Sequence, residues 1–325
     1  MSLLLDAFKG TNTRVPVWFM RQAGRYLPQY RALKAGRALY DLFRDPDTAA
    51  EITLLPVDIL GVDAAILFAD ILTLPAAMGF KIDYIDGRGP VIDNPIQTPK
   101  DIERVHDFDN LDYVARIIKK VNARLSSDIP LIGFAGAPYT VLNYLCPAVA
   151  KFNFTQGKAF SRVMEILTKN TIDYLRLQQK CGIKAFQLFD TWGGTLRAED
   201  YRVFVLPYVR RIFESVDLPS IYYLKNCAHL LPLMLKSGAD FLSVCETVRF
   251  NEIKTNKGVQ GNLFNGLLYA DDQTLGTETR KILKQARQYH KKYIFNLSHG
   301  IMPDVEVDKV RLVTDEVKRF SWQKA

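Results

Sequence analysis

Short apolar segments alternate with helix-like patterns along the whole chain, and this alternation limits the possible folds more than any other feature of the sequence. The segments with the composition of strands are residues 15–20, 64–69, 130–135, 185–189, 220–224, 241–244, 259–263 and 293–297. Between them, apolar residues recur at helical spacing, most clearly at residues 113–125, 159–179, 201–215 and 277–291. Eight strands that alternate with helices predict a parallel α/β sheet closed into a (β/α)8 TIM-type barrel, with an open doubly wound sheet as the alternative.

The length and composition favour one domain. A chain of 325 residues can form two domains, but barrels of this size often form one. No low-complexity tract and no change in composition divides the chain. Residues 83–99 are rich in Gly, Pro and Asp, so we expect a loop or hairpin there. We therefore expect a single domain over residues 1–325, with an active-site cleft at the C-terminal ends of the strands.

The formal net charge of +8 and the pI near 9.2 favour an anionic partner, which can be nucleic acid, a membrane surface or a polyanionic small molecule. The basic residues are dispersed and form no run of five or six, which disfavours nucleic acid. No apolar run is long enough to cross a membrane. Four cysteines without a CxxC pair indicate reduced thiols. We expect a cytoplasmic protein with no nucleic-acid or membrane partner.

The basic segment at residues 16–30 (PVWFMRQAGRYLPQY) is the first candidate for a binding site. No acidic residue lies between Asp6 and Asp41, yet Arg21 and Arg25 have apolar neighbours that suggest partial burial. Like charges four residues apart repel, and an unpaired buried charge is costly, so an anion should lie between them. A ligand carboxylate or phosphate matches the guanidinium fork. The alternative is a solvated basic face whose partners are acids from elsewhere in the fold.

Polar or small residues follow several other predicted strands, as expected at the functional end of a barrel. Asp70 has apolar residues on both sides and is either a buried helix cap or a functional group. Residues 133–144 (GFAGAPYTVLNY) combine small and aromatic residues, which fits either a flat ligand or a tight strand-to-helix turn. His299 follows the last strand; a structural histidine is the default, but this position favours the site.

Metal and nucleotide chemistry has little support in the sequence. Cys227, His229 and Cys245 suggest zinc, but their spacing departs from structural zinc patterns and no fourth ligand is evident. The chain has no Gly-rich dinucleotide or phosphate loop, no nucleophile elbow and no HExxH motif. We therefore expect neither a metal nor a nucleotide cofactor.

Together these segments resemble the uroporphyrinogen decarboxylase family of haem biosynthesis. The motifs at residues 16–30 and 133–144 carry the resemblance, with support from residues 64–72 (AAILFADIL), 186–194 (FQLFDTWGG) and 295–301 (FNLSHGI). The resemblance implies a distorted (β/α)8 barrel, a homodimer with one deep cleft per subunit, and a carboxy-lyase that needs no cofactor or metal. Such an enzyme removes carbon dioxide from the four acetate side chains of uroporphyrinogen III and yields coproporphyrinogen III.

The resemblance also assigns roles to residues. It implies two catalytic residues: Asp70, which holds the central pyrrole N–H groups, and Arg21, which supplies a proton. A guanidinium with a pKa above ~12 is a poor acid, so the second role is the weaker assignment. The substrate-binding residues that the resemblance implies are Arg21, Gln22, Ala23, Gly24, Arg25, Ile66, Asp70, Phe134, Tyr144, Phe189, Thr191 and His299.

The chain departs from the family pattern in loops at the cleft end, at residues 146–148 (CPA), 225–227 (KNC), 245–247 (CET) and 261–265 (GNLFN). These departures leave two alternatives open. One is a zinc-dependent, cobalamin-associated methyltransferase of the same superfamily, which is disfavoured because Lys225 stands where its metal-binding histidine should be. The other is a non-catalytic homologue that binds a tetrapyrrole or nucleic acid.

Overall fold

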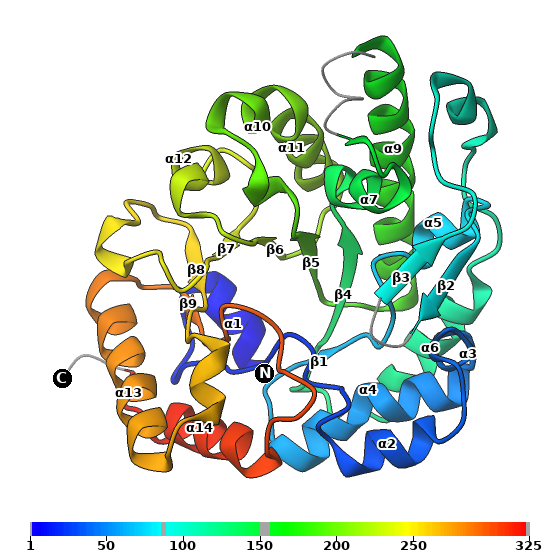
Figure 1. The fold of residues 1–325 in the computed structure, drawn as a ribbon. Coiled ribbons are helices and arrows are strands. Elements are labelled where there is room, and N and C mark those ends of the chain that lie inside the picture. Colours follow the sequence, from blue (N-terminus) through cyan, green and yellow to red (C-terminus); the bar gives the residue numbers. More distant parts are fainter. Residues whose placement is uncertain (1, 86–88, 150–156, 323–325) are drawn as a thin grey trace.

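A curled parallel sheet forms the centre of the protein (Figure 1). The computed structural model describes residues 2–85, 89–149 and 157–322. Within these residues seven strands pair in parallel, in the order β1-β4-β5-β6-β7-β8-β9. Their bounds are β1 Ala65–Ile66, β4 Leu131–Gly136, β5 Ala185–Asp190, β6 Ser220–Leu224, β7 Phe241–Ser243, β8 Gly258–Gln260 and β9 Tyr293–Ile294. The predicted α/β barrel class is confirmed.

The first predicted strand, residues 15–20, is not a regular strand, and to this extent the prediction is wrong. Val17 makes a single parallel bridge with Phe295. The Phe295 N–H donates to the Pro16 carbonyl (2.9 Å), and the Asp63 N–H donates to the Val17 carbonyl (2.8 Å). The segment therefore lies between β9 and β1 and closes the ring in the place of a strand.

Side-chain amides replace the backbone ladder at this closure. Asn296 Oδ1 accepts from the N–H groups of Met20 (3.2 Å) and Leu297 (2.9 Å). Gln22 Oε1 likewise accepts from the Phe19 N–H (3.0 Å). A backbone N–H that donates to a side chain is not available to a neighbouring strand. For this reason the closing segment and β9 are shorter than their apolar runs predict, and the barrel is distorted.

Helices cover the outer face of the sheet (Figure 1). The described α-helices are α1 Leu3–Lys9, α2 Pro28–Lys34, α3 Leu39–Arg44, α4 Pro46–Leu60, α5 Thr73–Ala77, α6 Asp112–Asn122, α7 Pro138–Leu145, α9 Gly157–Cys181, α10 Ala198–Phe204, α11 Leu206–Ser215, α12 Leu231–Met234, α13 Asp272–Tyr289 and α14 Val307–Arg319. The helix predicted at 201–215 is two helices, because Pro207 has no N–H to continue the ladder of α10. Among the described residues, no helix has the length and apolar composition to span a membrane.

The segment predicted as a loop or hairpin, residues 83–99, contains a hairpin. Strand β2 Ile82–Ile85 pairs antiparallel with β3 Gly89–Ile92. Residues 86–88 of this prediction lie outside the described residues. The hairpin stands apart from the barrel sheet and is the only excursion of this kind among the described strands.

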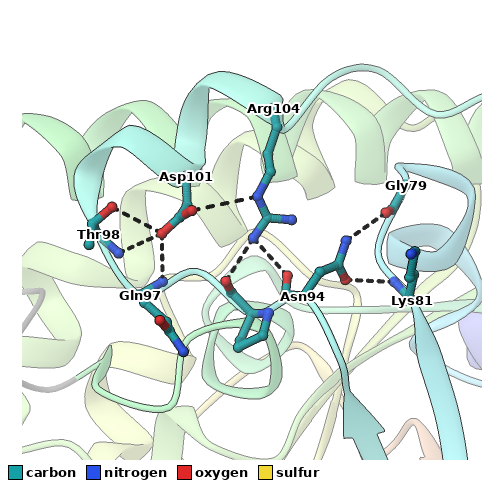
Figure 2. A network of polar contacts seen from close by, with 8 residues as sticks. Gly79, Lys81, Asn94, Gln97, Thr98, Asp101 and Arg104 are labelled. Carbon is teal, nitrogen blue, oxygen red and sulfur yellow. Dashed lines mark hydrogen bonds and ion pairs between the residues drawn. The ribbon is translucent and has the colours of Figure 1, made fainter.

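A polar network fixes the base of this hairpin (Figure 2). Asn94 donates to the Gly79 carbonyl (3.1 Å) and accepts from the Lys81 N–H (2.7 Å), which joins the two ends of the hairpin. Arg104, the last residue of the short helix η1 Pro99–Arg104, donates to the carbonyls of Asn94 and its neighbour at 2.7 Å. The hairpin is therefore anchored at both ends.

Candidate active site

A cleft of about 470 Å³ opens at the C-terminal ends of the barrel strands. Its walls come from the loop after Met20, from the ends of β1, β4, β5 and β6, from residues 299–303 and from the β2–β3 hairpin. Every residue that the sequence analysis assigns to the site lines this one cleft: Arg21, Gln22, Ala23, Gly24, Arg25, Ile66, Asp70, Phe134, Tyr144, Phe189, Thr191 and His299.

The two arginines face the cleft without an acidic partner. Neither Arg21 nor Arg25 forms an ion pair with a carboxylate of the described chain. Both are exposed, so the expected partial burial is wrong, because the cleft beside them is open to solvent. Arg21 has a left-handed backbone (φ 60°), which is uncommon for a residue with a side chain. Its stem packs on Gly300, where a Cβ would lie 2.4 Å from Arg21 Cδ.

The backbone between the arginines is arranged to bind an anion. The N–H groups of Ala23, Gly24 and Arg25 donate to no acceptor in the described chain. Gln22 holds this loop from below: its side chain is 1% exposed and its Nε2 donates to the Ala64 carbonyl (3.0 Å). Successive N–H groups without partners form a concavity suited to a carboxylate or phosphate.

Asp70 is half-buried in the loop that follows β1 and lines the cleft together with Arg21. Burial raises the pKa of its carboxyl, whereas the Leu72 N–H (2.8 Å to Oδ1), the Tyr84 hydroxyl and the Arg21 charge act to lower that pKa. Asp70 also holds the turn that leads into α5, because its Oδ1 accepts from the Leu72 N–H and its own N–H donates to Thr73 Oγ1 (3.2 Å). The carboxyl therefore lines the cleft and makes a cap-like contact at the same time.

His299 is a neutral imidazole at neutral pH. Burial, together with the positive charges of Arg21 and Lys225, lowers its pKa to about 4, and a hydrogen bond with the Gly300 backbone and the charge of Glu246 act in the opposite direction. Its ring can therefore exchange hydrogen bonds with a ligand without adding a further positive charge to the cleft.

Thr191 presents a hydroxyl without a partner, because no described group hydrogen-bonds its buried Oγ1. Its neighbour Asp190 is fully buried and anchors the loop, accepting from the Thr140 hydroxyl (2.5 Å), the Gly193 N–H (3.0 Å) and the Tyr222 hydroxyl (2.7 Å). Burial raises the pKa of Asp190. A buried hydroxyl that lacks a hydrogen bond is costly, so Thr191 Oγ1 is suited to bind a polar group of a ligand.

Aromatic rings form the apolar wall of the cleft. Phe134 meets Phe189 edge to face, with ring centroids 5.5 Å apart, and Phe189 meets Tyr223 at 5.7 Å. Tyr144 packs edge-on against the half-exposed Trp192 at 6.4 Å. These rings, with Ile66, form an apolar wall next to the charged loop. The cleft therefore suits a molecule that combines an apolar ring system with negatively charged groups.

Four tyrosines line the cleft without having been predicted from the sequence: Tyr26 and Tyr30, which lie in or beside the basic segment, and Tyr84 and Tyr223. Tyr84 reaches it from β2 and hydrogen-bonds Asp70, and Tyr223 reaches it from β6. The signal for Tyr84 is the alternation of part-buried Ile82 and Tyr84 with exposed Asp83, which is typical of a strand. Tyr223 lies within a continuous apolar run, where no pattern tells the inward side chains from the outward ones.

Comparison with known proteins identifies the family. A family model described as Uroporphyrinogen decarboxylase (URO-D) matches residues 1–320. The chain belongs to the uroporphyrinogen decarboxylase family. Two proteins named uroporphyrinogen decarboxylase, from Trichlorobacter lovleyi and Aquifex aeolicus, are 37% and 38% identical to it, each match covering 98% of both chains. The resemblance seen in the sequence is confirmed.

Members of the uroporphyrinogen decarboxylase family share their fold with other enzymes. A solved structure of a methyltransferase from Methanosarcina mazei superposes with a TM-score of 0.84 over 97% of each chain, at 20% identity. A B12-independent methionine synthase from a Shewanella strain reaches 0.59, with 84% of this chain and 87% of that chain covered, at 11% identity. At such low identity these likenesses show the fold alone.

The ligand set that the zinc alternative needs is not assembled. Cys227 and Cys245 lie together, but His229 is exposed and its Nε2 hydrogen-bonds the Leu196 carbonyl (2.8 Å). Across the part of the chain that the structure describes, no group of three His, Cys, Asp or Glu side chains is placed to hold a metal ion. The residues themselves therefore give the methyltransferase alternative no support.

Proposed function

We propose that this protein removes carbon dioxide from the four acetate side chains of uroporphyrinogen III to give coproporphyrinogen III, in tetrapyrrole biosynthesis and without a cofactor or metal. The observation that carries the proposal is the position of the Asp70 carboxyl beside two unpaired arginines in one cleft. Membership of the uroporphyrinogen decarboxylase family and the names of its relatives support it. The substrate carries eight carboxylates, which suits a basic cleft in a chain of net charge +8.

The proposed chemistry needs a fixed negative charge. Direct loss of carbon dioxide from a pyrrole acetate would leave an unstabilised carbanion. Protonation of the neighbouring ring carbon makes the pyrrole cationic, and the electrons of the breaking carbon–carbon bond then move into that ring. A second proton reaches the freed methylene carbon to give the methyl group, and the first proton leaves the ring carbon, so each acetate takes up one proton and releases one carbon dioxide. The Asp70 carboxylate, placed at the pyrrole N–H groups, stabilises the cation electrostatically. Hydrogen bonds from these N–H groups favour ionised Asp70 and offset the effect of burial on its pKa.

The remaining residues have binding roles in this proposal. Arg21, Arg25 and the free N–H groups of residues 23–25 bind substrate carboxylates as charge-assisted hydrogen-bond donors. Thr191, Tyr144 and neutral His299 bind further polar groups, and Ile66, Phe134 and Phe189 pack on the macrocycle. We assign proton delivery to Arg21 acting through a bound water, because the guanidinium itself, with a pKa above ~12, is a poor acid.

Incubation of the purified chain with uroporphyrinogen III tests this function. The expected product, in the presence of a metal chelator, is coproporphyrinogen III, separated by chromatography from intermediates that keep one to three acetates. Binding of the substrate without any product would favour the non-catalytic homologue. Turnover that appears only after zinc is added would favour metal-dependent chemistry.

The same resemblance leads us to propose that residues 1–325 act as one domain, in a cytoplasmic homodimer that uses neither nucleic acid nor membrane. Exposed apolar side chains such as Val203, Phe264 and Tyr269 are available for a subunit interface. Analytical ultracentrifugation tests the assembly: a species of twice the 37.0 kDa chain mass is expected, and a stable monomer would contradict the proposal.

A further inference from the structure

Two cysteines that the proposed reaction does not use lie side by side just beyond the ends of β6 and β7. The sulfurs of Cys227 and Cys245 are 3.5 Å apart, and the Cys245 N–H donates to Cys227 Sγ (3.4 Å). Both are free thiols. Within the described chain, Cys146 and Cys181 have no second sulfur beside them. The fold therefore brings two thiols together from residues that are 18 positions apart in the sequence.

The two sulfurs have unequal surroundings. Cys245 Sγ accepts a hydrogen bond from the Cys227 thiol and lies 3.1 Å from the Thr247 hydroxyl. These donors stabilise a thiolate, and the pKa of Cys245 is lowered to about 5. The hydrogen bond to Cys245, together with burial, raises the pKa of Cys227. An ionised thiol beside a protonated one is the arrangement in which one sulfur attacks and the other resolves.

The pair lies directly beneath exposed loops. Cys245 is 2% exposed, but residues 246–247, which follow it, form an exposed turn. Residues 225–226, which precede Cys227, are exposed as well. Asn226 has a left-handed backbone (φ 55°), which sharpens the turn that brings Cys227 back under the surface. Both sulfurs are therefore buried but lie next to exposed backbone turns, through which a small, uncharged oxidant can approach.

We propose that Cys227 and Cys245 form a reversible intramolecular disulfide when the protein meets hydrogen peroxide. The Cys245 thiolate attacks one peroxide oxygen, which gives a sulfenic acid and releases hydroxide. The Cys227 thiol then attacks the sulfenic sulfur, the S–S bond forms, and water leaves. In sum the two thiols lose two protons and two electrons, and the peroxide becomes two waters. A dithiol reductant reverses the change by thiol–disulfide exchange.

The bond would join two loops behind the cleft wall, because neither cysteine lines the cleft. Cys227 follows Tyr223, which lines the cleft and donates from its hydroxyl to the Ser298 carbonyl (3.3 Å), next to His299. Cys245 precedes Glu246, whose charge acts on the same histidine. The dithiol thus lies behind the cleft wall, and its oxidation fixes the ends of β6 and β7 to each other without consuming a residue of the proposed site.

Peptide mapping without reduction tests this proposal on the full chain. After treatment of the reduced protein with hydrogen peroxide, we expect a cross-linked peptide that joins Cys227 to Cys245 and a mass loss of two hydrogens. Of the four thiols, two should remain, and dithiothreitol should restore the others. Oxidation of Cys146 or Cys181 while the pair stays reduced would overturn the proposal, and so would separate sulfinic acids on the two sulfurs.

Single-cysteine variants test the order of attack. In Cys227→Ser, Cys245 should stop at the sulfenic acid and react with a dimedone probe, because the resolving thiol is absent. In Cys245→Ser, Cys227 should stay reduced. Cys181→Ser, on α9, is the matched control and should cross-link as the natural chain does. A sulfenic acid on Cys227 in the Cys245→Ser chain would contradict the roles assigned to the two sulfurs.

Discussion

Strand β1 has a carboxylate near each end, and the closing segment beside it, residues 15–20, has an arginine at each end. The hydrogen bonds and ion pairs of these charged groups differ between the two ends. Before the strand, Asp63 accepts from both arms of Arg14 (2.6 and 2.9 Å) and from the Val17 N–H (2.9 Å). After the strand, Asp70 accepts from the Leu72 N–H and the Tyr84 hydroxyl only, and Arg21 has no ion-pair partner among the described residues.

This difference separates the charged groups that stabilise the fold from the charged groups that remain available to a substrate. The pair of Arg14 and Asp63 ties the closing segment to β1, so its groups are used within the fold. The groups at the cleft end are left with unused hydrogen-bonding capacity, which favours binding of an anionic substrate and lowers the stability of the empty protein. The comparison therefore predicts that equivalent substitutions at the two ends have opposite consequences.

Asp70→Asn should have the largest effect. Loss of one preorganised electrostatic group that stabilises a reaction intermediate lowers turnover by roughly 10²–10³-fold. The rate of coproporphyrinogen III formation measures this, with Asp58→Asn on the exposed face of α4 as the control that should keep full activity. If Asp70→Asn retains more than a tenth of the activity, the carboxylate does not have the proposed role.

Asp63→Ala should have the next largest effect, on stability. It removes the partner of Arg14 and leaves the Val17 N–H without an acceptor, which should lower the free energy of unfolding by about 2–3 kcal/mol. Denaturant unfolding measures the loss, and Asp58→Ala should change it by less than about 0.5 kcal/mol. An unchanged midpoint for Asp63→Ala would remove the contrast between the two ends.

Arg25→Ala should weaken substrate binding without unfolding the protein. A charge-assisted hydrogen bond contributes about 1.5–3 kcal/mol, so KM should rise by about 10- to 100-fold. Arg116→Ala removes the same charge from the exposed side of α6 and should leave KM unchanged. Equal effects of the two substitutions would mean that the cleft responds to net charge and not to this arginine.

Tyr84→Phe should have the smallest effect, on pH dependence. The Tyr84 hydroxyl favours ionised Asp70 and lowers the pKa of that carboxyl. Without it the pKa of Asp70 rises, so the acid limb of the activity profile should move to higher pH by roughly one unit or less. A pH–rate profile measures this shift, and movement to lower pH would show that the hydroxyl does not act on the carboxylate.

The sequence predicted which residues line one cleft better than it predicted the closure of the barrel. Arg21, Asp70, Thr191 and His299 each follow a predicted strand, and parallel strands bring their C-terminal ends to one edge, so local patterns were sufficient to group them. The residues that distort the barrel act at long range. For example, Asn296 Oδ1 accepts from the Met20 N–H, and this hydrogen bond forms only because two segments that are far apart in the sequence meet in the fold.

The exposure of the arginines was mispredicted for a similar reason. The apolar residues next to Arg21 and Arg25 in the sequence indicate that this segment packs on the core. They do not predict the open cleft on its other side, because residues from the whole barrel and from the β2–β3 hairpin form that cleft. Tyr84 was not predicted as a site residue because its segment is rich in turn-forming residues and was expected to be a loop or hairpin. Its strand belongs to the hairpin whose base Asn94 and Arg104 anchor (Figure 2), and these contacts join residues that are up to 15 positions apart.

The stability of Asp70→Asn tests the central claim most directly. The folded-state pKa of Asp70 lies above its ordinary value of 3.8, so its contribution to stability is largest below that pH and is lost as the pH rises through the folded-state value. An uncharged amide removes the burial penalty at pH 7. The denaturant midpoint of Asp70→Asn should therefore exceed that of the natural chain. A decrease of more than about 1 kcal/mol would instead make Asp70 a structural residue like Asp63.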